Sequence, residues 1–437
     1  MMRELQEKVP LVWKFIGAQF LCADTMYRRS RFVVAKKTEN HLYLFHTLTK
    51  QCYQTDRDLM REQLSAEEIE NNPDLKKLTE EWFYVKQDYD ESRQYFSVFK
   101  ILRAFRAEKG FVHYLIYPTS KCNARCVYCI EEDMKKRSMK AETARQAAAY
   151  IASTHRKGAK ICLTWWGGEP LIEEKKIDLI TEYLQNEKID YFSNMITNGS
   201  LINERIIHKM HDLWKMDLVQ ISMDCGEQEY IRRKNYYSYH NEYFTIMEKV
   251  NELVQNDVGV MVRVNVDMDN IAYAEEFIRD LKKAVREPSK VPLYFAPLHQ
   301  SRAADGDSIW KNVFRLDHVV REEGFANRFE HLPNFFTLYK CMSDGQEGVV
   351  IDTEGRLLAC EACVEGTSFG DVWNGVVDKE MWNSHNEICE IREECKTCVC
   401  LPLCTPFSKC PHVQANCKAL PMHEIDMGLE RIIAENE

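Results

Sequence analysis

Three cysteine residues lie close together in one short stretch, Cys122, Cys126 and Cys129, with the spacing C-x3-C-x2-C. Iron–sulfur clusters prefer thiolate ligands, so three such residues can hold three irons of a [4Fe–4S] cube and leave the fourth iron without a protein ligand. A small molecule can chelate at that open iron. The alternative is zinc, because many C-x2-C pairs in cytosolic proteins bind zinc and His113 lies nearby as a further ligand.

The chain that carries these cysteines alternates between short apolar runs and amphipathic helices. The expected strands are residues 112–117, 160–164, 191–196, 218–223, 259–266 and 292–296, and the expected helices are 141–155, 175–185, 203–213, 242–255 and 272–285. This alternation predicts an α/β fold with a parallel sheet and right-handed connections. Six strands favour an open, partial (β/α)6 barrel of the TIM type over a closed eight-stranded barrel.

Polar residues fall where such a fold places its functional groups, at the carboxyl ends of the strands. The three cysteines follow the first expected strand. Further polar or glycine residues follow or end the next four strands: Gly167, Gly168, Glu169, Pro170, Asn198, Asp224, Arg263 and Asn265. We therefore expect one site at this edge of the sheet.

Taken together, these motifs resemble the radical S-adenosylmethionine (SAM) superfamily. The cysteine spacing, with the aromatic Tyr128 before the last cysteine, resembles the cluster loop of that superfamily, and residues 167–170 resemble its Gly-Gly-Glu motif. The resemblance implies SAM and a [4Fe–4S] cluster as cofactors. It also implies a set of SAM-binding residues, namely Gly167, Gly168, Glu169, Pro170, Asn198, Arg263 and Asn265.

Each of these assignments has a simpler alternative. The glycines could form an ordinary tight turn, whereas in the resembled family Glu169 would accept from the methionyl ammonium of SAM. Arg263 and Asn265 match positions that contact the SAM carboxylate and ribose, but an ion-paired core position would also explain a charged residue on a buried strand. Asp224 is a candidate catalytic residue that either lines the substrate cavity or caps a turn.

A second group of cysteines lies near the end of the chain. The sequence has 17 cysteines, and nine of them fall between Cys360 and Cys417, with Cys341 shortly before. In a long chain without a signal peptide this favours metal or clusters over disulfides. The group resembles the SPASM extension of radical SAM enzymes, which implies two auxiliary [4Fe–4S] clusters, although zinc ribbons share such spacings.

By the SPASM pattern, one auxiliary cluster would have the ligands Cys395, Cys398, Cys404 and Cys417, and the other would have Cys341, Cys360 and Cys410. The pattern departs from that family in two ways. Five residues separate Cys404 from Cys410, where the family usually has three, and no cysteine lies shortly upstream of Cys341. Cys363 is a candidate fourth ligand for the second cluster, and no role is assigned to Cys389 or Cys400. Glu361, next to Cys360, occupies a position where some relatives carry a catalytic acid; the alternative is a solvated turn residue.

Residues 1–110 are expected to form a separate block. Residues 31–35 and 41–45 are predicted as a β-hairpin, followed by a charged helical region at 56–70, a helix capped by Asp74 that runs to Trp82, and a strand at 83–87. This order resembles a winged-helix-like module, which in several radical SAM peptide maturases binds the leader of a precursor peptide. An exposed strand edge beside a helix groove can bind a peptide by β-augmentation. The alternative is a purely structural extension.

Composition limits the remaining possibilities. The chain has 437 residues, is 45% hydrophobic and carries a formal net charge of −10, which argues against a nucleic acid partner. Without a long apolar run or a signal peptide, we expect no membrane partner and a cytoplasmic location. The expected domains are 1–110, 111–307 (with a polar linker at 299–307) and 308–437.

The resemblance implies an enzyme that uses a 5′-deoxyadenosyl radical to abstract hydrogen from its substrate. The first hypothesis is a maturase of a ribosomally made (RiPP) precursor peptide that installs a thioether or carbon–carbon crosslink, with a flavodoxin or ferredoxin-type reductant. The alternative is an enzyme similar to anaerobic sulfatase maturases, which form formylglycine. A third hypothesis, from another class, is a non-catalytic zinc-bearing binding protein.

Overall fold

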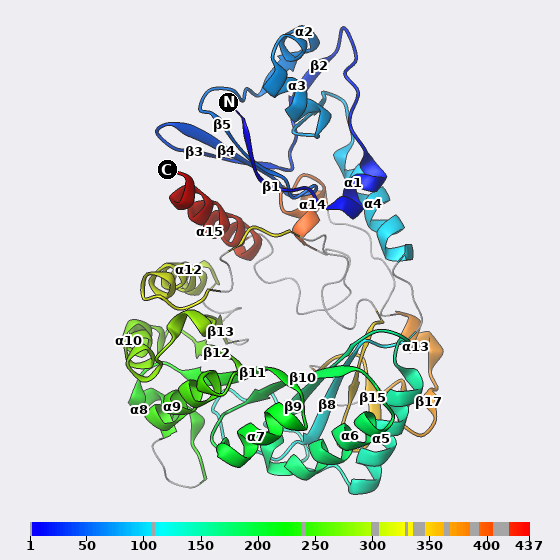
Figure 1. Ribbon diagram of the computed structural model, residues 1–437, viewed down its shortest axis with the longest axis vertical. Coiled ribbons are helices and arrows are strands. Elements are labelled where there is room, and N and C mark those ends of the chain that lie inside the picture. Colours follow the sequence, from blue (N-terminus) through cyan, green and yellow to red (C-terminus); the bar gives the residue numbers. More distant parts are fainter. Residues whose placement is uncertain are drawn as a thin grey trace. The chain divides into compact units, whose positions relative to one another are not determined.

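The computed structural model describes residues 2–105, 110–237, 242–298, 306–327, 331–334, 346–361, 368–384, 393–404 and 419–437. The chain divides into two compact units. The barrel unit comprises residues 109–328 and 341–387. The terminal unit combines residues 1–108 with 329–340 and 388–437, so it contains both ends of the chain (Figure 1).

The barrel unit is built on a parallel sheet. Six neighbouring strands pair in sequence order, β8 (His113–Thr119), β9 (Ile161–Gly167), β10 (Tyr191–Thr197), β11 (Met216–Asp224), β12 (Gly259–Val266) and β13 (Leu293–Pro297). Beyond β8 the same sheet continues with parallel β14 (Gly348–Ile351) and then antiparallel β15 (Arg356–Leu358), β16 (Gly370–Asp371) and β17 (Gly375–Val376). Among the described strands, β13 pairs only with β12, so the barrel is open on that side.

Helices connect successive strands of this sheet, and α5, α6 and α7 cover its outer face (Figure 1). The α-helices of the barrel unit are α5 (Ala141–Thr154), α6 (Glu174–Asn186), α7 (Glu204–Asp212), α8 (Glu227–Lys234), α9 (Glu242–Gln255), α10 (Ala274–Ala284), α12 (Gly306–Glu322) and α13 (Lys379–Ser384). Three short 3-10 helices, η1 (Pro170–Glu173), η2 (Ile271–Tyr273) and η3 (Pro288–Lys290), complete the connections.

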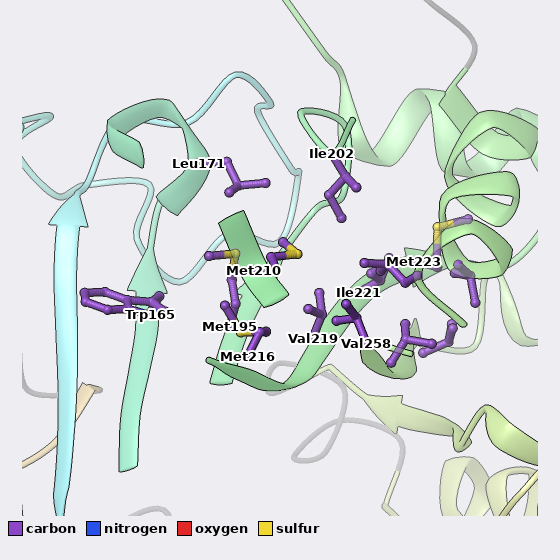
Figure 2. Close-up of a cluster of buried hydrophobic side chains, with 14 of the residues drawn as sticks. Trp165, Leu171, Met195, Ile202, Met210, Met216, Val219, Ile221, Met223 and Val258 are labelled. Atoms are coloured by element: carbon purple, nitrogen blue, oxygen red, sulfur yellow. The ribbon is translucent and has the colours of Figure 1, made fainter. Parts of the chain in front are cut away.

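The core of this unit lies between the sheet and the helices. Figure 2 shows alternate residues of β11, Val219, Ile221 and Met223, in one cluster with Met195 of β10 and Met210 of α7. All five side chains are buried. Because alternate strand residues point to opposite faces, the intervening positions on β11 are free to line the inside of the barrel. Each fully buried aliphatic side chain contributes about 1.5–3 kcal/mol to this packing.

The predicted elements of the barrel are confirmed. All six expected strands and all five expected helices are present, and the strand at 259–266 and the helix at 242–255 match at both ends. The expected helix at 272–285 is divided into η2 and α10. The sequence reasoning did not predict α8 or the continuation of the sheet through β14 to β17.

The terminal unit contains two small antiparallel sheets. One has the order β1 (Arg3–Gln6), β5 (Cys52–Asp56), β4 (His41–His46) and β3 (Val33–Lys37), and the other has the order β6 (Gln63–Ser65), β2 (Met26–Arg29) and β7 (Tyr84–Lys86). The helices are α1 (Pro10–Ile16), α2 (Ala66–Glu70), α3 (Pro73–Glu80), α4 (Glu91–Phe105), α14 (Glu393–Lys396), η5 (Leu401–Leu403) and α15 (Ala419–Asn436). The order of strands and helices in residues 2–105 includes the predicted hairpin and the strand at 84–86.

Two predictions for this unit were wrong in detail. The charged region 56–70 is helical only in the short α2, because Ser65 caps that helix with Glu68 in a capping box and β6 precedes it. The following helix is capped by Asn72, whose side chain accepts from the backbone N–H groups of Asp74 and Leu75. Pro at the first helical position places Asp74 inside the helix rather than at its cap.

The C-terminal cysteine segment, residues 393–404, packs against the N-terminal strands and helices within the terminal unit. Cys395 and Leu401 share a hydrophobic cluster with Tyr95 and Phe99 of α4. Cys400 lies in a second cluster with Ile425 of α15 and several strand residues. The predicted third domain, 308–437, is thus divided between the two compact units. The domain boundaries, the winged-helix assignment and the SPASM assignment stay predictions, and most of the expected linker at 299–307 lies outside the described residues.

None of the helices in the described part of the chain is long and apolar enough to cross a membrane.

Candidate functional site

The loop that carries Cys122, Cys126 and Cys129 follows β8 and is held by backbone hydrogen bonds to the end of α8. The N–H of Arg125 donates to the carbonyl oxygens of Lys234 and Asn235 at 3.0 and 3.1 Å, and the N–H of Val127 donates to that of Arg233 at 3.0 Å. The guanidinium of Arg125 also stacks on the ring of Tyr237 at 4.4 Å. These contacts give the loop a defined path.

The Gly167-Gly168 pair is required by a close approach between β9 and the start of this loop. The N–H of Gly168 donates to the carbonyl of Thr119, and the N–H of Glu169 donates to that of Lys121, at 3.1 and 2.9 Å. A Cβ atom on Gly167 or Gly168 would lie 2.3 Å from one of those carbonyl oxygens. The glycines therefore let the second strand fix the backbone directly before Cys122.

The carboxylate of Glu169 is fully buried and points into the protein. It accepts from the hydroxyl of Thr197 at 2.8 Å, the N–H of Asn198 at 2.9 Å and the N–H of Leu171 at 3.2 Å. Burial raises the pKa of Glu169, while these hydrogen bonds lower it. The carboxylate joins the ends of β9 and β10, so its observed contacts are with the scaffold; direct contact with the SAM ammonium stays a prediction.

Asn198 links the third strand to the cysteine loop. Its side-chain carbonyl accepts from the N–H and hydroxyl of Ser200, and its amide donates to the side-chain carbonyl of Asn123 at 2.9 Å. The same amide lies 3.9 Å from the Sγ of Cys122, and the N–H of Ala124 lies 3.4 Å from that sulfur. Two donors directed at one sulfur fit a thiolate ligand, since hydrogen bonds to the sulfurs tune iron–sulfur clusters.

Burial of the three thiols opposes their ionisation. It raises the pKa of Cys122 to about 11 and also raises the pKa of Cys126 and of Cys129. A bound metal deprotonates such a thiol outright. In the described part of the chain, no three His, Cys, Asp or Glu side chains are grouped as ligands of a single metal ion. Three thiols in one loop are the type of donor that iron–sulfur clusters prefer.

A buried polar network lies beside the loop. The hydroxyl of Tyr128 donates to Asp224 Oδ2 at 2.6 Å and accepts from the amide of Asn265 at 3.3 Å. Arg263 Nε donates to Asn265 Oδ1 at 3.2 Å. Asp224 and Asn265 are paired across β11 and β12, so the register of the sheet brings together three of the predicted site residues and the aromatic residue of the cysteine loop.

Asp224 is fully buried, and its Oδ1 has no hydrogen-bond partner among the described residues. Burial raises its pKa, and Lys234 and Tyr128 act in the opposite direction. An unsatisfied buried oxygen is costly, so this atom is placed to accept a hydrogen bond from a bound ligand. The role of Asp224 in a ligand or substrate site stays a prediction.

Lys234, the last residue of α8, was missed by the sequence reasoning. Its side chain is only 3% exposed, and its ammonium lies 3.7 Å from Asp224 Oδ2 and 5.9 Å from the centroid of the Tyr128 ring. The neighbouring Arg233 forms a bidentate pair with Asp267 at 2.6 and 2.7 Å. The available signal was the Arg-Arg-Lys run shortly after Asp224, which resembles an ordinary solvated helix face.

A second group of polar side chains lies around Tyr117 on β8. The Tyr117 hydroxyl donates to the backbone carbonyl of Glu361 at 3.4 Å, and the Cys360 thiol lies 3.5 Å from Glu361 Oε2. The indole N–H of Trp166 donates to Glu131 at 3.1 Å, and burial raises the pKa of Glu131. The predicted residues Cys360 and Glu361 are thus both next to Tyr117, whereas Glu131 was not predicted.

The predicted auxiliary ligands are only partly described. Cys395, Cys398 and Cys404 belong to the terminal unit, and Cys360 belongs to the barrel unit. The remaining predicted ligands and one unassigned cysteine lie outside the described residues, namely Cys341, Cys363, Cys410, Cys417 and Cys389. The two ligand sets therefore stay predictions.

The barrel unit is thus an open parallel sheet with connecting helices, and three cysteines follow its strand β8. Residues 116–281 match the Radical SAM superfamily, so the chain carries a radical SAM domain. That domain implies SAM and a [4Fe–4S] cluster as cofactors. The sequence is 29% identical over 177 residues to an uncharacterized protein of Methanocaldococcus jannaschii, covering 39% of this chain and 59% of that protein.

It is also 34% identical over 107 residues to a probable GTP 3′,8-cyclase of Methanococcus maripaludis, covering 24% of this chain and 34% of that protein. The chain thus covers less than two thirds of the length of either relative.

Two solved structures show the same fold. One is native anSMEcpe with bound AdoMet and the Cp18Cys peptide, with a TM-score of 0.56 and 17% identity, covering 74% of this chain and 98% of that chain. The other is SuiB of Streptococcus suis bound to the precursor peptide SuiA, with a TM-score of 0.52 and 13% identity, covering 89% of this chain and 100% of that chain. At these identities the likeness concerns the fold.

Proposed function

We propose that this protein is a radical SAM peptide maturase that acts on a ribosomally made precursor peptide and installs a thioether or carbon–carbon crosslink. The observation that carries the proposal is the fold likeness to SuiB, whose structure contains a precursor peptide and which matches 89% of this chain, against 74% for anSMEcpe. Both of these structures contain a peptide, which supports a peptide substrate.

In this proposal, Cys122, Cys126 and Cys129 hold the [4Fe–4S] cluster at which SAM is bound. The two cofactors supply a 5′-deoxyadenosyl radical that abstracts hydrogen from the substrate. The chain's own residues bind and orient the ligand. The proposed SAM-binding residues are Gly167, Gly168, Glu169, Pro170, Asn198, Arg263 and Asn265, to which the structure lets us add Lys234.

Different residues in this set have different tasks. Gly167 and Gly168 let β9 approach the loop, and Glu169 acts as a positioning residue because its carboxylate ties two strand ends together. Asp224 Oδ1 is the buried acceptor for a donor group of the ligand or substrate. Lys234 supplies a fixed positive charge beside it, which favours a carboxylate on the ligand.

Two further assignments complete the proposal. Glu361 is the candidate catalytic acid or base, next to Cys360 and Tyr117. The cysteines of the SPASM-like pattern hold two auxiliary clusters, and a flavodoxin or ferredoxin-type protein delivers the electrons.

The leader of the precursor peptide is proposed to bind to the terminal unit. Strand β7 is an edge strand of the sheet β6-β2-β7, so one side of it lacks a neighbouring strand among the described residues. Beside it lies a groove of about 610 Å³ between α1, β7 and α4. Its walls include the apolar Phe15, Ile16 and Ile101, the rings of Trp82 and Tyr89, and side chains of both charges, Lys86, Asp88, Asp90 and Arg93. The outward carbonyls of Tyr84 and Lys86 on β7 already accept from the Gln19 amide at 2.7 Å and from the Tyr89 N–H at 3.0 Å. The groove itself, rather than strand addition to β7, is therefore proposed to hold the peptide.

The decisive experiment uses anaerobically reconstituted protein, a strong reductant, SAM and the short peptides encoded beside its gene. We expect formation of 5′-deoxyadenosine together with a loss of mass in one peptide that corresponds to a new crosslink. SAM cleavage without modification of any such peptide, combined with aldehyde formation on a sulfatase-derived cysteine or serine peptide, would instead establish the formylglycine-forming alternative. The radical SAM domain disfavours the third hypothesis, a zinc-bearing binding protein.

The groove has its own test. Arg93→Glu should lower the affinity for the full-length precursor and slow its modification, while SAM cleavage without peptide continues. Arg57→Glu is the matched control, because Arg57 is exposed on the same unit but does not line the groove. Equal affinity of the Arg93→Glu variant and the unmodified protein for the precursor would remove this groove from the proposal.

A further inference from the structure

Lys50 is a fully buried lysine in the turn between β4 and β5 of the terminal unit. Its ammonium nitrogen has no hydrogen-bond partner in the described part of the chain, and neither do the Thr49 hydroxyl and the Gln51 side-chain carbonyl, which flank it and are also buried. Nor does any carboxylate of a described residue form a salt bridge with Lys50 within 4.0 Å. The turn therefore buries an amine without a direct partner, and burial lowers the pKa of Lys50 to about 7.

The backbone holds Lys50 in this position. Lys50 has a left-handed backbone conformation with a φ of 69°. Its N–H donates to the carbonyl of His46 at 2.7 Å, and its carbonyl accepts from the Gln6 side-chain amide at 2.7 Å. The ring nitrogen Nδ1 of His46 accepts from the N–H groups of Leu48 and Thr49, each at 3.2 Å. A turn fixed by so many contacts keeps the lysine from swinging out to solvent.

The C-terminal cysteine segment packs against this same turn. The Thr47 hydroxyl donates to the carbonyl of Val399 at 2.6 Å. Cys400 is buried in a cluster with Phe45 and Cys52, the residues that border the turn on β4 and β5. Burial lowers the pKa of Lys50, and the groups that oppose this effect are Glu424 of α15 and Cys400. The lysine therefore lies within electrostatic reach of the cysteine segment.

A buried charge without a partner costs several kcal/mol. Such a residue is retained more readily when a group of opposite charge occupies the same site. A [4Fe–4S] cluster bound by four thiolates carries a net negative charge, and the charge around a cluster sets its potential. The unpartnered cation and the nearby cysteines are complementary in this sense.

We propose that Lys50 is the counter-charge of an anionic metal–thiolate group held by the cysteines of residues 395–404. The β4–β5 turn of the N-terminal part of the chain then forms one wall of that site, and the terminal unit needs the metal group to neutralise its core. This inference rests on the auxiliary-cluster part of the proposed function.

The experiment first isolates the auxiliary sites by replacing Cys122, Cys126 and Cys129 with Ala together. This background protein should retain iron and sulfide after anaerobic reconstitution. If it binds no iron, the auxiliary clusters are absent, and the proposed role of Lys50 falls with them, whereas the parent protein still reports separately, by SAM cleavage, on the barrel site.

Lys50→Met is then introduced into the background protein. We expect iron loss to a chelator to become roughly 10–100-fold faster, and the reduction potential of the remaining cluster, followed by electron paramagnetic resonance, to become more negative because a positive charge is gone. In the metal-free protein the same variant should be at least as stable as the background, since an apolar side chain replaces a buried unpaired charge. Lys50→Met should thus weaken the metal-bound protein but should not weaken the metal-free protein.

Lys50→Arg should restore most of the iron retention, because it keeps the charge. Lys36→Met is the matched control: Lys36 belongs to the same unit and forms a half-exposed salt bridge with Glu430 at 3.2 Å. Unchanged iron retention and potential in Lys50→Met would overturn the proposal. So would an equal loss of stability with and without metal, which would give Lys50 a purely structural role.

Discussion

The two cysteine-bearing regions of this protein are built in different ways. The loop with Cys122, Cys126 and Cys129 is surrounded by polar partners from neighbouring strand ends, including Asn198 and the Tyr128–Asp224 pair. The segment with Cys395 and Cys400 packs instead into apolar clusters, with one buried cation, Lys50, nearby. The first region thus has mainly polar surroundings, and the second has mainly apolar ones.

This difference predicts whether a substitution in each region should affect ligand binding or folding. In the barrel, the polar side chains Asn198, Tyr128 and Asn265 beside the cysteine loop have named partners at hydrogen-bond distance, so single substitutions there should affect ligand binding directly. In the terminal unit, the cysteines are tied to the N-terminal strands through packing, so substitutions should affect folding together with metal retention.

The largest effect is expected from Cys126→Ala. Loss of one of three thiol ligands should abolish SAM cleavage and reduce the iron content by the share of one cluster. Cys162→Ala is the matched control, since Cys162 lies on β9 and contacts the Asn194 amide at 3.4 Å rather than the loop. If Cys126→Ala cleaved SAM at the parent rate, the assignment of the barrel cluster would be wrong.

The next largest effect concerns the buried pair of Lys234 and Asp224. Lys234→Met should destabilise the barrel unit by about 3–5 kcal/mol, because it leaves the Asp224 carboxylate buried without a counter-charge. Adding Asp224→Asn should recover part of that loss in a denaturant titration, which gives a coupling free energy between the two sites. Lys249→Met is the control: it removes a half-exposed ion pair with Glu252 and should cost less than about 1 kcal/mol. Strictly additive effects of Lys234→Met and Asp224→Asn would contradict an interaction between Lys234 and Asp224.

A smaller effect is expected at Gly168. In Gly168→Ala the new methyl group would lie 2.3 Å from the carbonyl oxygen of Lys121, which should cost about 1–3 kcal/mol through displaced backbone. The displaced loop should also bind less iron at the barrel site. Gly158→Ala is the comparison: nothing lies within 4 Å of its Cβ position, so its only cost comes from its φ of +75°. It should leave the iron content unchanged.

The smallest effect concerns the pH dependence of the terminal unit. Burial lowers the pKa of His46 to about 3, against 6.5 for the unfolded chain. Below pH 6.5 the imidazole of His46 binds a proton in the unfolded state but stays neutral in the folded state. The contribution of His46 to the free energy of unfolding is therefore fully present above pH 6.5 and decreases as the pH falls toward 3. At pH 5.5 the loss should be about 1.4 kcal/mol.

His46→Gln should flatten this part of the pH profile in thermal or urea unfolding. His211→Gln, at an exposed residue of α7, should leave the profile as it was. An unchanged slope in His46→Gln would show that another group causes the acid sensitivity.

Much of the barrel could be predicted from the sequence, because its strands are buried apolar runs and its helices have a clear apolar face. The strand at 259–266 is an example, with Val262 and Val264 in the core and Arg263 and Asn265 on the opposite face. The same alternation placed Arg263 and Asn265 on one face, where the structure joins them by a hydrogen bond.

The rest depended on contacts that the local sequence does not encode. Helix α8 has only two apolar residues among eight, Tyr230 and Ile231, so its apolar periodicity is weak. Lys234 is nevertheless buried, and its backbone carbonyl accepts from the N–H of Arg125 in the cysteine loop. The inward direction of the Glu169 carboxylate follows from its neighbours on β10. Likewise, no local pattern indicates that Cys395 and Cys400 pack against strands and helices that begin some 300 residues earlier in the chain.

The joining of residues 1–108 and 388–437 in one unit has a consequence for synthesis on the ribosome. Tyr95, Phe99 and Phe45 are synthesised some 300 residues before the residues of segments 395–401 and 425–429 with which they pack. Because domains that are contiguous in sequence can fold as they emerge, the central barrel can be complete while the early segment still exposes part of its apolar surface. The nascent early segment should therefore keep part of its apolar surface exposed until residues 388–437 have been synthesised.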